Sequence, residues 1–563
     1  MPKVVNNLLF LILVIGSISV DGNSLMDFSS EERNRGDETL MEDDVSDTVI
    51  CVKDFDFYWP TSFKVLSLNV NDQLVLGFDS EGLWKSDGTE EGTFMLKDVR
   101  IWEMPENSEV VSNGVFLFGG RESSSTTHQL WKTDGTREGT VLVKIIHPYD
   151  AMPHNFQFVW NRWIFKAAAE YYYSTGVLGG WRVSSYGVFI SDGTTDGTYQ
   201  VHPNFSSGYE PIFVFELAEK DVVFYSTNIY TCHELFENIS LLKYIDTYEI
   251  INPTKASDSL VFFGTRDAFY IDNNRYQKST LWKTDGTLGG TELLVDSLRN
   301  NISNFTIVNG KLFFIGDDVT HGEELWTSDG TQEGTRLVKD IQTGVLSSNL
   351  GNLIDYNGKL YFTVYDDDIG FSLWESNGTE DGTFLIKKID SDTLVNNVNN
   401  MMVYHHHLFF SVINKDGSVD LWTSDGTAIA TSFLQQLAKF DGYCILDGNC
   451  ISNLIFIDDI LYFLINDSYH AESIELWKYV LPSEFYTGAE LIKRNETIVY
   501  PNPTHDFLYF ISPRKSNHIH ILDVYGRVLY DNEIADNFID VSFLSAGIYI
   551  VNINSTSSRF IKY

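Results

Sequence analysis

Short stretches of alternating apolar and polar residues recur along most of the chain. One clear set covers residues 352–356, 359–364, 372–375 and 383–388. Asn357-Gly358 separates the first two stretches, and Asn377-Gly378-Thr379 separates the last two. Alternation with a period of two is typical of a half-buried β-strand, and Asn-Gly favours a tight hairpin turn. The pattern therefore predicts four antiparallel strands joined by short turns.

A phrase whose best copies read Leu-Trp-Lys-Thr-Asp-Gly-Thr-x-x-Gly-Thr marks nine such sets, spaced 44 to 58 residues apart. A regular period of this length indicates a repeat architecture, and four short strands with their turns make one propeller blade. We therefore predict an all-β chain, with a large β-propeller of eight or nine four-stranded blades over residues 50–495 and a small β-sandwich over 496–563. Clear copies begin at Leu83, Leu130, Leu281, Leu325, Leu373 and Leu421, and weaker copies centre on Phe189, Phe236 and Trp477.

The repeated phrase is interpreted first as a structural device. Asp-Gly permits a positive φ, the Asp and Thr side chains bond turn amides, and Trp packs between neighbouring sheets. A residue needed in every unit is best explained by what every unit needs, which is closure of its hairpin and burial against the next unit. The alternative is that each Asp binds a cation or each Trp stacks on a sugar.

Strand order separates two ends of each blade. The tight turns follow the first and third strands, so the loop between strands two and three and the blade-to-blade connection lie at the opposite end. Function concentrates on variable loops over a rigid scaffold, so we expect ligands there. Two insertions at this end carry aromatics and arginines suited to sugar or protein recognition; alternatively they fill the channel of a wide ring. The predicted ligand-binding residues are Tyr171, Tyr172, Tyr173, Trp181, Arg182 and Tyr186 in the insertion over 166–186, and Phe269, Tyr270, Arg275 and Tyr276 in the insertion over 266–278.

The ring is predicted to close through its amino terminus. Residues 50–55 (Ile-Cys-Val-Lys-Asp-Phe) resemble the fourth strand of other units, such as 337–341 (Leu-Val-Lys-Asp-Ile). They precede the first complete unit, so pairing with the last one would hide two open sheet edges.

The amino-terminal residues read as an export signal. Lys3 precedes an apolar run over residues 8–20, and small residues follow it, which is typical of a signal peptide over 1–22. That run is too short to span a bilayer, and no later run approaches about 20 apolar residues, so we expect no transmembrane anchor. The acidic, polar stretch over 23–49 is expected to be a flexible leader.

The net charge of the chain limits the classes of binding partner that we expect. The 563 residues include 78 acidic and 39 basic ones, a net charge of −39, which repels nucleic acid and anionic membranes. Acidic residues gather at the variable-loop end, but no twelve-residue calcium-loop pattern accompanies them, so we expect no cofactor, with Ca²⁺ as the alternative. These acids are Asp79, Glu81, Asp317, Asp318, Asp366, Asp367, Asp368, Asp416 and Asp467.

The cysteines and histidines do not point to a metal site or a catalytic site. Cys444 and Cys450 flank a turn-rich segment and are predicted to form a local disulfide, whereas Cys51 and Cys232 are expected not to bond to each other. Residues 405–407 (His-His-His) occupy the place of the Asn-Gly turn in other units, and we expect a solvated turn rather than a metal site. No nucleophile elbow, phosphate loop or His-Glu-x-x-His motif occurs.

Two resemblances follow from these residues. Residues 324–335 (Glu-Leu-Trp-Thr-Ser-Asp-Gly-Thr-Gln-Glu-Gly-Thr) resemble the ELWxxDGTxxGT repeat of exported bacterial proteins. Residues 500–503 (Tyr-Pro-Asn-Pro), 521–528 and 544–551, with Lys562 near the end, look like the carboxy-terminal sorting domain of the type IX secretion system of Bacteroidetes. This resemblance implies a β-sandwich recognised by the type IX machinery, and a secreted or outer-surface location.

The sequence therefore favours a β-propeller binding or adhesion protein outside the cell, with a glycan or protein ligand. The alternative is a surface polysaccharide hydrolase or lyase that uses the same face, which requires acid and base groups converging on one substrate.

Overall fold

The computed structural model describes the chain from residue 49 onward, with gaps. The described residues are 49–55, 65–71, 73–78, 81–104, 111–174, 180–202, 212–271, 274–366, 370–389, 395–414, 416–439, 451–467, 473–482, 485, 498–500, 507–511, 517–523, 527–534, 538–553 and 556–562. The predicted signal peptide, nearly all of the leader and the Cys444–Cys450 pair lie outside them.

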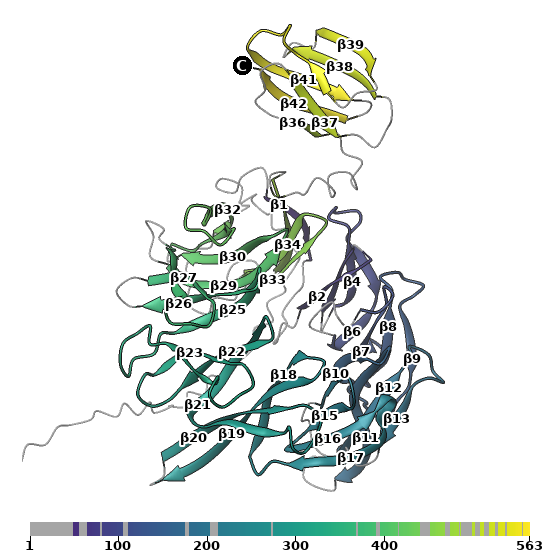
Figure 1. Cartoon of the computed structure of the whole chain (residues 1–563). Coiled ribbons are helices and arrows are strands. Elements are labelled where there is room, and N and C mark those ends of the chain that lie inside the picture. Colours follow the sequence, from purple (N-terminus) through teal and green to yellow (C-terminus); the bar gives the residue numbers. More distant parts are fainter. Residues whose placement is uncertain are drawn as a thin grey trace, which may run out of the picture. The chain divides into compact units, whose positions relative to one another are not determined.

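Nine four-stranded antiparallel units follow one another through the described residues (Figure 1). We call them blades 1 to 9. Blade 1 holds β2 (Val65–Val70), β3 (Gln73–Phe78), β4 (Gly82–Ser86) and β5 (Phe94–Lys97). Blade 2 holds β6 (Val99–Glu103), β7 (Phe116–Glu122), β8 (Gln129–Thr133) and β9 (Val141–Lys144). Blade 3 holds β10 (His154–Val159), β11 (Arg162–Ser174), β12 (Gly180–Ser191) and β13 (Tyr199–His202). Blade 4 holds β14 (Ile212–Phe215), β15 (Asp221–Tyr225), β16 (Asn228–His233) and β17 (Glu237–Tyr244), with a 3-10 turn η2 (Glu234–Phe236) before β17.

Blades 5 and 6 share one continuous strand, so they form a single seven-stranded sheet. Their strands are β18 (Glu249–Ser257), β19 (Leu260–Ile271), β20 (Asn274–Thr284), the shared β21 (Glu292–Val308), β22 (Lys311–Asp317), β23 (Glu323–Ser328) and β24 (Arg336–Lys339). Blade 7 holds β25 (Leu350–Tyr356), β26 (Lys359–Asp366), β27 (Gly370–Ser376) and β28 (Thr383–Lys388). Blade 8 holds β29 (Val395–Tyr404), β30 (His407–Asn414), β31 (Ser418–Ser424) and β32 (Ser432–Lys439).

Blade 9 confirms the predicted closure. Its first three strands are β33 (Ile451–Ile457), β34 (Ile460–Asp467) and β35 (Ser473–Val480), and its fourth is the amino-terminal β1 (Val49–Asp54). Ile50 pairs with Lys478 and Cys51 with Trp477. One sheet is thus completed by the two ends of the repeat region.

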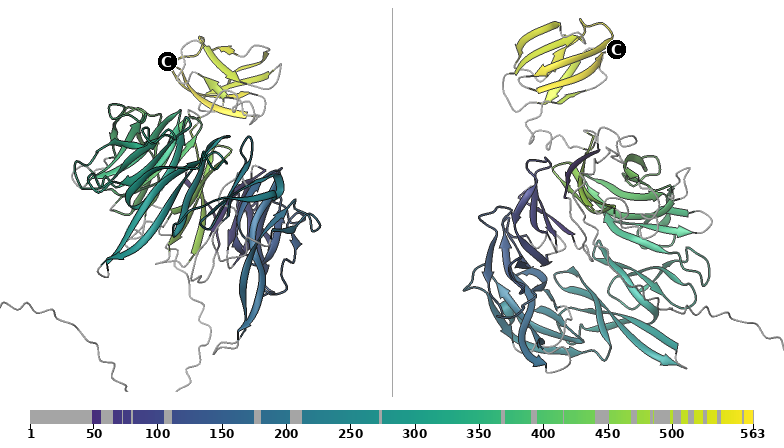
Figure 2. Two further views of the ribbon diagram at one scale, coloured as in Figure 1. Left: turned by 60° about the horizontal axis from the view of Figure 1, so that its bottom comes forward. Right: turned by 180° about the vertical axis from the view of Figure 1, so that it is seen from behind.

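The sheets of the propeller are shown from two further sides in Figure 2. Apolar clusters join neighbouring sheets. Between blades 1 and 2, for example, Val70 and Val75 pack with Phe116, Phe118 and Trp131. Between blades 9 and 1, Tyr462 and Leu464 pack with Leu74 and Leu76. The repeated Trp is therefore a packing residue between sheets, as the sequence predicted.

The repeated Asp-Gly-Thr turn is held by its own side chains, as the unit of blade 6 shows. Asp329 Oδ1 accepts hydrogen bonds from the Thr331 amide (2.9 Å) and hydroxyl (2.7 Å), and the Gly334 amide donates to Thr331 Oγ1 (2.9 Å). The Thr331 hydroxyl lowers the pKa of Asp329 from its ordinary value. The same bonds recur around Asp87, Asp134, Asp192 and Asp285. This use of the carboxylate favours the structural interpretation of the phrase.

The innermost strands contain a feature that the sequence analysis missed. Asparagines with positive φ bulge several of these strands, and their side chains reach the next blade. Asn352 Nδ2 donates to the Val398 carbonyl (2.8 Å), and the Ile212 amide donates to Asn155 Oδ1 (2.9 Å). The detectable signal is an asparagine five residues before the first turn, as in Asn304/Asn309 and Asn352/Asn357.

The histidine turn of blade 8 corrects one expectation. His405 and His406 have φ values of 43° and 59°, so they do form the tight turn. His405 is not solvated, however, because its side chain is only 11% exposed and it pairs with Asp459 of blade 9. The neighbouring blade supplies the partner, which local sequence does not reveal.

The free cysteines agree with the expectation. Cys51 lies on β1 and Cys232 on β16, and both are free thiols. Among the described residues, none belongs to a helix long and apolar enough to cross a membrane.

The carboxy-terminal residues form two small sheets. One contains β36 (Ile498–Tyr500), β37 (Phe507–Ile511) and β40 (Phe538–Asp540). The other contains β38 (Asn517–Asp523), β39 (Val528–Ile534), β41 (Gly547–Ile553) and β42 (Thr556–Lys562), in the order β39-β38-β41-β42. Leu508 and Ile539 of the first sheet share a core with Ile519, Ile521 and Val551 of the second. This is the predicted β-sandwich.

Candidate functional site

The two predicted insertions are extended β-hairpins rather than irregular loops. Strands β11 and β12 stay paired beyond the rest of their sheet, which places Tyr172 opposite Arg182 and Tyr173 opposite Trp181. Strands β19 and β20 do the same, with Phe269 opposite Tyr276 and Tyr270 opposite Arg275. Alternating, β-prone residues in both arms explain the pairing.

The side chains of nine of the ten predicted ligand-binding residues lie outside those described, so only Tyr186 is placed in full. It is 6% exposed and packs edge-on against His154, with ring centroids 5.3 Å apart. The Lys166 ammonium lies 6.0 Å from the Tyr186 ring and 5.0 Å from the Tyr225 ring. Tyr186 therefore supports the base of the hairpin from inside the blade.

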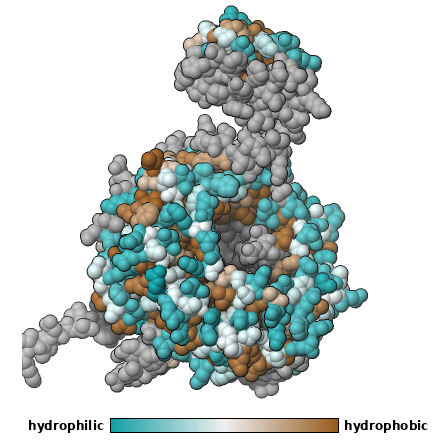
Figure 3. All heavy atoms as spheres, viewed as in Figure 1, coloured by the Kyte–Doolittle hydropathy of each residue, from teal (hydrophilic) through white to brown (hydrophobic). Residues whose placement is uncertain are grey.

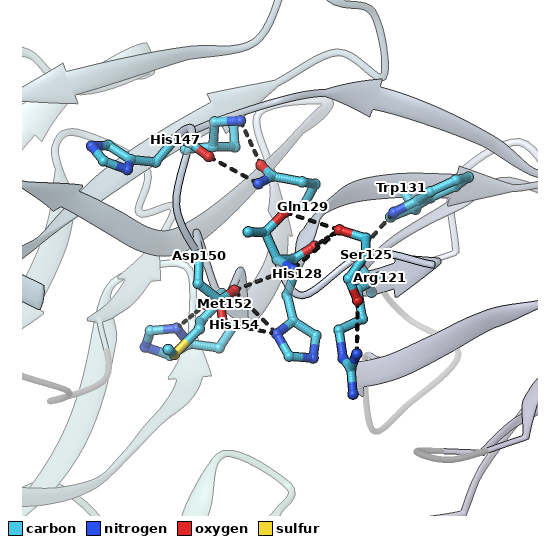
Figure 4. Close-up of polar contacts among 12 residues, drawn as sticks. Arg121, Ser125, His128, Gln129, Trp131, His147, Asp150, Met152 and His154 are labelled. Atoms are coloured by element: carbon cyan, nitrogen blue, oxygen red, sulfur yellow. Dashed lines mark hydrogen bonds and ion pairs between the residues drawn. The ribbon is translucent and has the colours of Figure 1, made fainter. Parts of the chain in front are cut away.

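A polar cluster lies beside this hairpin, at the connection from blade 2 to blade 3 (Figure 4). Asp150, on the connection from β9 to β10, accepts a hydrogen bond from the His128 amide (2.7 Å) and lies 3.1 Å from His128 Nδ1. The Ala151 amide donates to the His128 carbonyl (3.0 Å). The loop before β8 and the inter-blade connection are thus bound to each other.

The residue before the repeated Leu-Trp anchors this connection. Gln129 Nε2 donates to the His147 carbonyl (2.9 Å), and the Ile146 amide donates to Gln129 Oε1 (2.9 Å). In blade 6, Glu324 holds the equivalent connection by accepting a hydrogen bond from the Ile341 amide (3.2 Å). Burial raises the pKa of Glu324 to about 7. The Glu or Gln of the phrase was a signal that sequence reasoning did not use.

Exposed aromatic rings flank the cluster. Trp102, on the innermost strand β6, is 38% exposed, and its ring centroid lies 5.2 Å from that of His128. Tyr149 is 37% exposed and rests against His147 at 5.5 Å. Arg121 Nη1 donates to the Ser125 carbonyl (2.8 Å), which fixes the loop before His128. A flat exposed ring beside polar groups that are already held in place suits recognition of a sugar or a peptide.

Other parts of the propeller surface are weaker candidates for a binding site. Figure 3 shows a hollow in the middle of the propeller face that it draws, with polar and apolar residues round it. At the turn end, a groove of about 500 Å³ lies between blades 7 and 8, lined among others by Tyr361, Glu375 and Asp425. It forms where repeated turns meet, and Lys359 already pairs with Glu375 at 2.6 Å.

Three of the acidic residues at the variable-loop end accept hydrogen bonds from neighbouring protein groups. Asp317 accepts hydrogen bonds from Arg299 (3.1 Å) and Asn300 (3.0 Å), and Asp318 accepts from the Thr320 amide (3.0 Å). Asp416 accepts from the Ser418 hydroxyl (2.7 Å). These contacts give Asp317, Asp318 and Asp416 a role in holding their own loops.

A buried histidine beneath the hairpin gives a pH prediction. Burial lowers the pKa of His154, its Nδ1 contact with the Met152 carbonyl (2.8 Å) opposes this shift, and the Lys166 charge adds to it. The unfolded histidine gains a proton as pH falls through about 6.5, before the folded one does, so the free energy of unfolding should fall on acidification.

We expect His154→Asn to reduce this loss, because an amide can donate to Met152 but does not titrate. Urea unfolding of both proteins at about pH 7.5 and about pH 5.5 measures it. His147, whose pKa burial also lowers, is present in both proteins and cancels in the comparison. Equal losses in both proteins would contradict the prediction.

Comparison with known proteins gives a family match for the carboxy-terminal tail. Residues 498–563 match the model of the secretion system C-terminal sorting domain. No curated protein matches the chain in sequence.

Several solved structures are similar at low identity. One is PorZ, described as an essential bacterial surface component of the type IX secretion system of Porphyromonas gingivalis, with a TM-score of 0.30, 12% identity, 89% of this chain covered and 75% of that one. Another is the β-propeller domain of the Trilobed protease from Pyrococcus furiosus, with a TM-score of 0.31, 10% identity, and 58% and 96% covered. A third is the Dos1 propeller, with a TM-score of 0.39, 10% identity, and 76% and 95% covered. The chain is a secreted or cell-surface β-propeller protein that carries a type IX secretion sorting domain at its carboxy terminus.

Proposed function

We propose that the propeller is the binding head of an exported adhesion protein, and that it recognises a carbohydrate or a protein at its variable-loop end. The observation that carries this proposal is the exposed Trp102 ring beside the His128–Asp150 pair. Within this proposal, residues 1–22 are the signal peptide, 23–49 the leader, 50–495 the propeller and 496–563 the domain read by the secretion machinery.

The cluster is suited to binding because it is built before the ligand arrives. His128 is oriented by Asp150, and the segment that carries Asp150 is held by Gln129. A rigid site loses little conformational entropy on binding, so more of the contact energy appears as affinity. The β11–β12 hairpin of the next blade begins beside this cluster, since the Ala168 amide donates to the Ala151 carbonyl (2.7 Å).

Binding to a glycan array tests the proposal, with the full exported chain and its Trp102→Ala variant. Loss of this exposed aromatic ring should weaken binding to the glycans that the wild type recognises by about ten-fold or more. Tyr248→Ala is the matched control, since Tyr248 is 72% exposed on the connection from β17 to β18 at the same end.

Three outcomes decide the matter. Selective loss in the Trp102 variant supports the site, whereas equal binding by both variants places the ligand elsewhere. Release of product from the bound glycans would replace the binding role by the hydrolase or lyase alternative. A peptide array run with the same variants covers a protein ligand.

A further inference from the structure

Two histidines and an aspartate meet on the outward face of the carboxy-terminal sandwich. Strand β38 alternates, with Ile519 and Ile521 fully buried in the core and His518 and His520 on the other face. On the neighbouring strand β39, Asp531 is paired directly opposite His520. Residues paired in an antiparallel sheet share a face, so backbone register brings all three side chains together.

The ligand atoms of this trio are close. His518 Nε2 lies 3.1 Å from Asp531 Oδ1, and His520 Nδ1 lies 3.7 Å from Asp531 Oδ2. One ligand atom from each of the three residues fits within a mutual separation of 4.8 Å. The two imidazole rings lie 4.5 Å apart, centroid to centroid, and are tilted by 69°.

These distances suit a small transition-metal ion. Zn²⁺ binds imidazole nitrogen and carboxylate oxygen at about 2.0–2.2 Å in a tetrahedron, which separates neighbouring ligand atoms by roughly 3.3–3.5 Å. The separations of 3.1 and 3.7 Å, which run to the two different oxygens of Asp531, lie on either side of that value. A hard cation such as Ca²⁺ prefers an all-oxygen shell of six to eight ligands and does not suit this set.

We propose that the tail binds one divalent transition-metal ion, Zn²⁺ by preference, through His518, His520 and Asp531. Glu533, paired opposite His518, is on the same face of the sheet and can supply the fourth ligand; otherwise water completes the tetrahedron. The ion would link β38 to β39, so its occupancy would stabilise this sheet. The site is independent of any ligand of the propeller.

Zinc titration of the metal-free full chain, followed by calorimetry, tests the proposal. We expect one zinc equivalent to bind the wild type and a His518→Ala/His520→Ala double variant to bind it at least about ten-fold more weakly. Asp531→Asn should lose affinity as well. His321→Ala is the matched control, because His321 pairs with one carboxylate, that of Asp318 in the propeller, and its loss should leave zinc binding unchanged.

A second measurement covers variants that fold poorly. Co²⁺ bound to the wild type should show the visible absorption of a tetrahedral ion, and Zn²⁺ should displace it. Ca²⁺ should neither displace the Co²⁺ nor bind differently to wild type and double variant. Equal zinc affinity and stoichiometry in the wild type and the double variant, or a Co²⁺ spectrum of purely octahedral type, would overturn the assignment.

Discussion

Replacing Phe55 by alanine is expected to destabilise the whole propeller by about 3–5 kcal/mol, the usual cost of removing a buried aromatic ring. Phe55 directly follows β1 and is 6% exposed. Its ring lies 5.1 Å from those of Phe78 and Trp84 in blade 1, while its amide donates to the Ile474 carbonyl in blade 9 (3.0 Å). The residue therefore joins the last blade to the first.

Urea unfolding of the full chain measures this effect, and Ile50→Ala is its matched control. Ile50 lies on β1 itself but is 44% exposed, so its truncation should change the free energy of unfolding by no more than about 0.5 kcal/mol. Equal effects of the two substitutions would show that β1 is not essential for closing the ring.

Replacing Gly334 by alanine is expected to cost about 2–3 kcal/mol, because it breaks a charge-assisted turn. A Cβ at Gly334 would lie 2.0 Å from Asp329 Oδ1, closer than any real contact. The carboxylate would have to turn away and give up its bond to the Thr331 hydroxyl. The second glycine of the phrase is thus favoured by the closeness of a side chain, not by backbone torsion.

Blade 8 supplies the control for this prediction. It has Ala430 where the other clear copies of the phrase have glycine, and the Ala430 amide lies 3.3 Å from Thr427 Oγ1, compared with 2.9 Å for the Gly334 amide in blade 6. Ala430→Gly should therefore leave stability unchanged or raise it by less than about 1 kcal/mol, in thermal unfolding followed by calorimetry. A loss comparable to that of Gly334→Ala would contradict the steric explanation.

The candidate site was only partly accessible from the sequence. The variable-loop end and its aromatic insertions followed from strand order, because strand order fixes which loops share an end. The pairing of His128 with Asp150 did not, since the two residues are 22 positions apart and strands β8 and β9 lie between them. Tyr186 looked like a surface residue within an insertion, yet the continued hairpin buries it against His154.

His405 shows the same limit. Its positive φ was foreseeable from the Asn-Gly turns at equivalent places in other units, because a tight hairpin turn is a local property. Its partner Asp459 belongs to the next blade, and only the packing of two sheets brings the two residues together.

The sequence by itself determined the features that repeat. The period, the strand alternation and the turn residues predicted the blades, and a segment before the first unit that resembles a fourth strand predicted the closure by β1. These local rules recur from unit to unit, so each copy reinforces the others. The tertiary structure alone decided which irregular residues meet, such as Trp102 with His128 across blade 2 and the asparagine bonds between inner strands. Those contacts depend on the angle and spacing between neighbouring sheets, which no single repeat encodes.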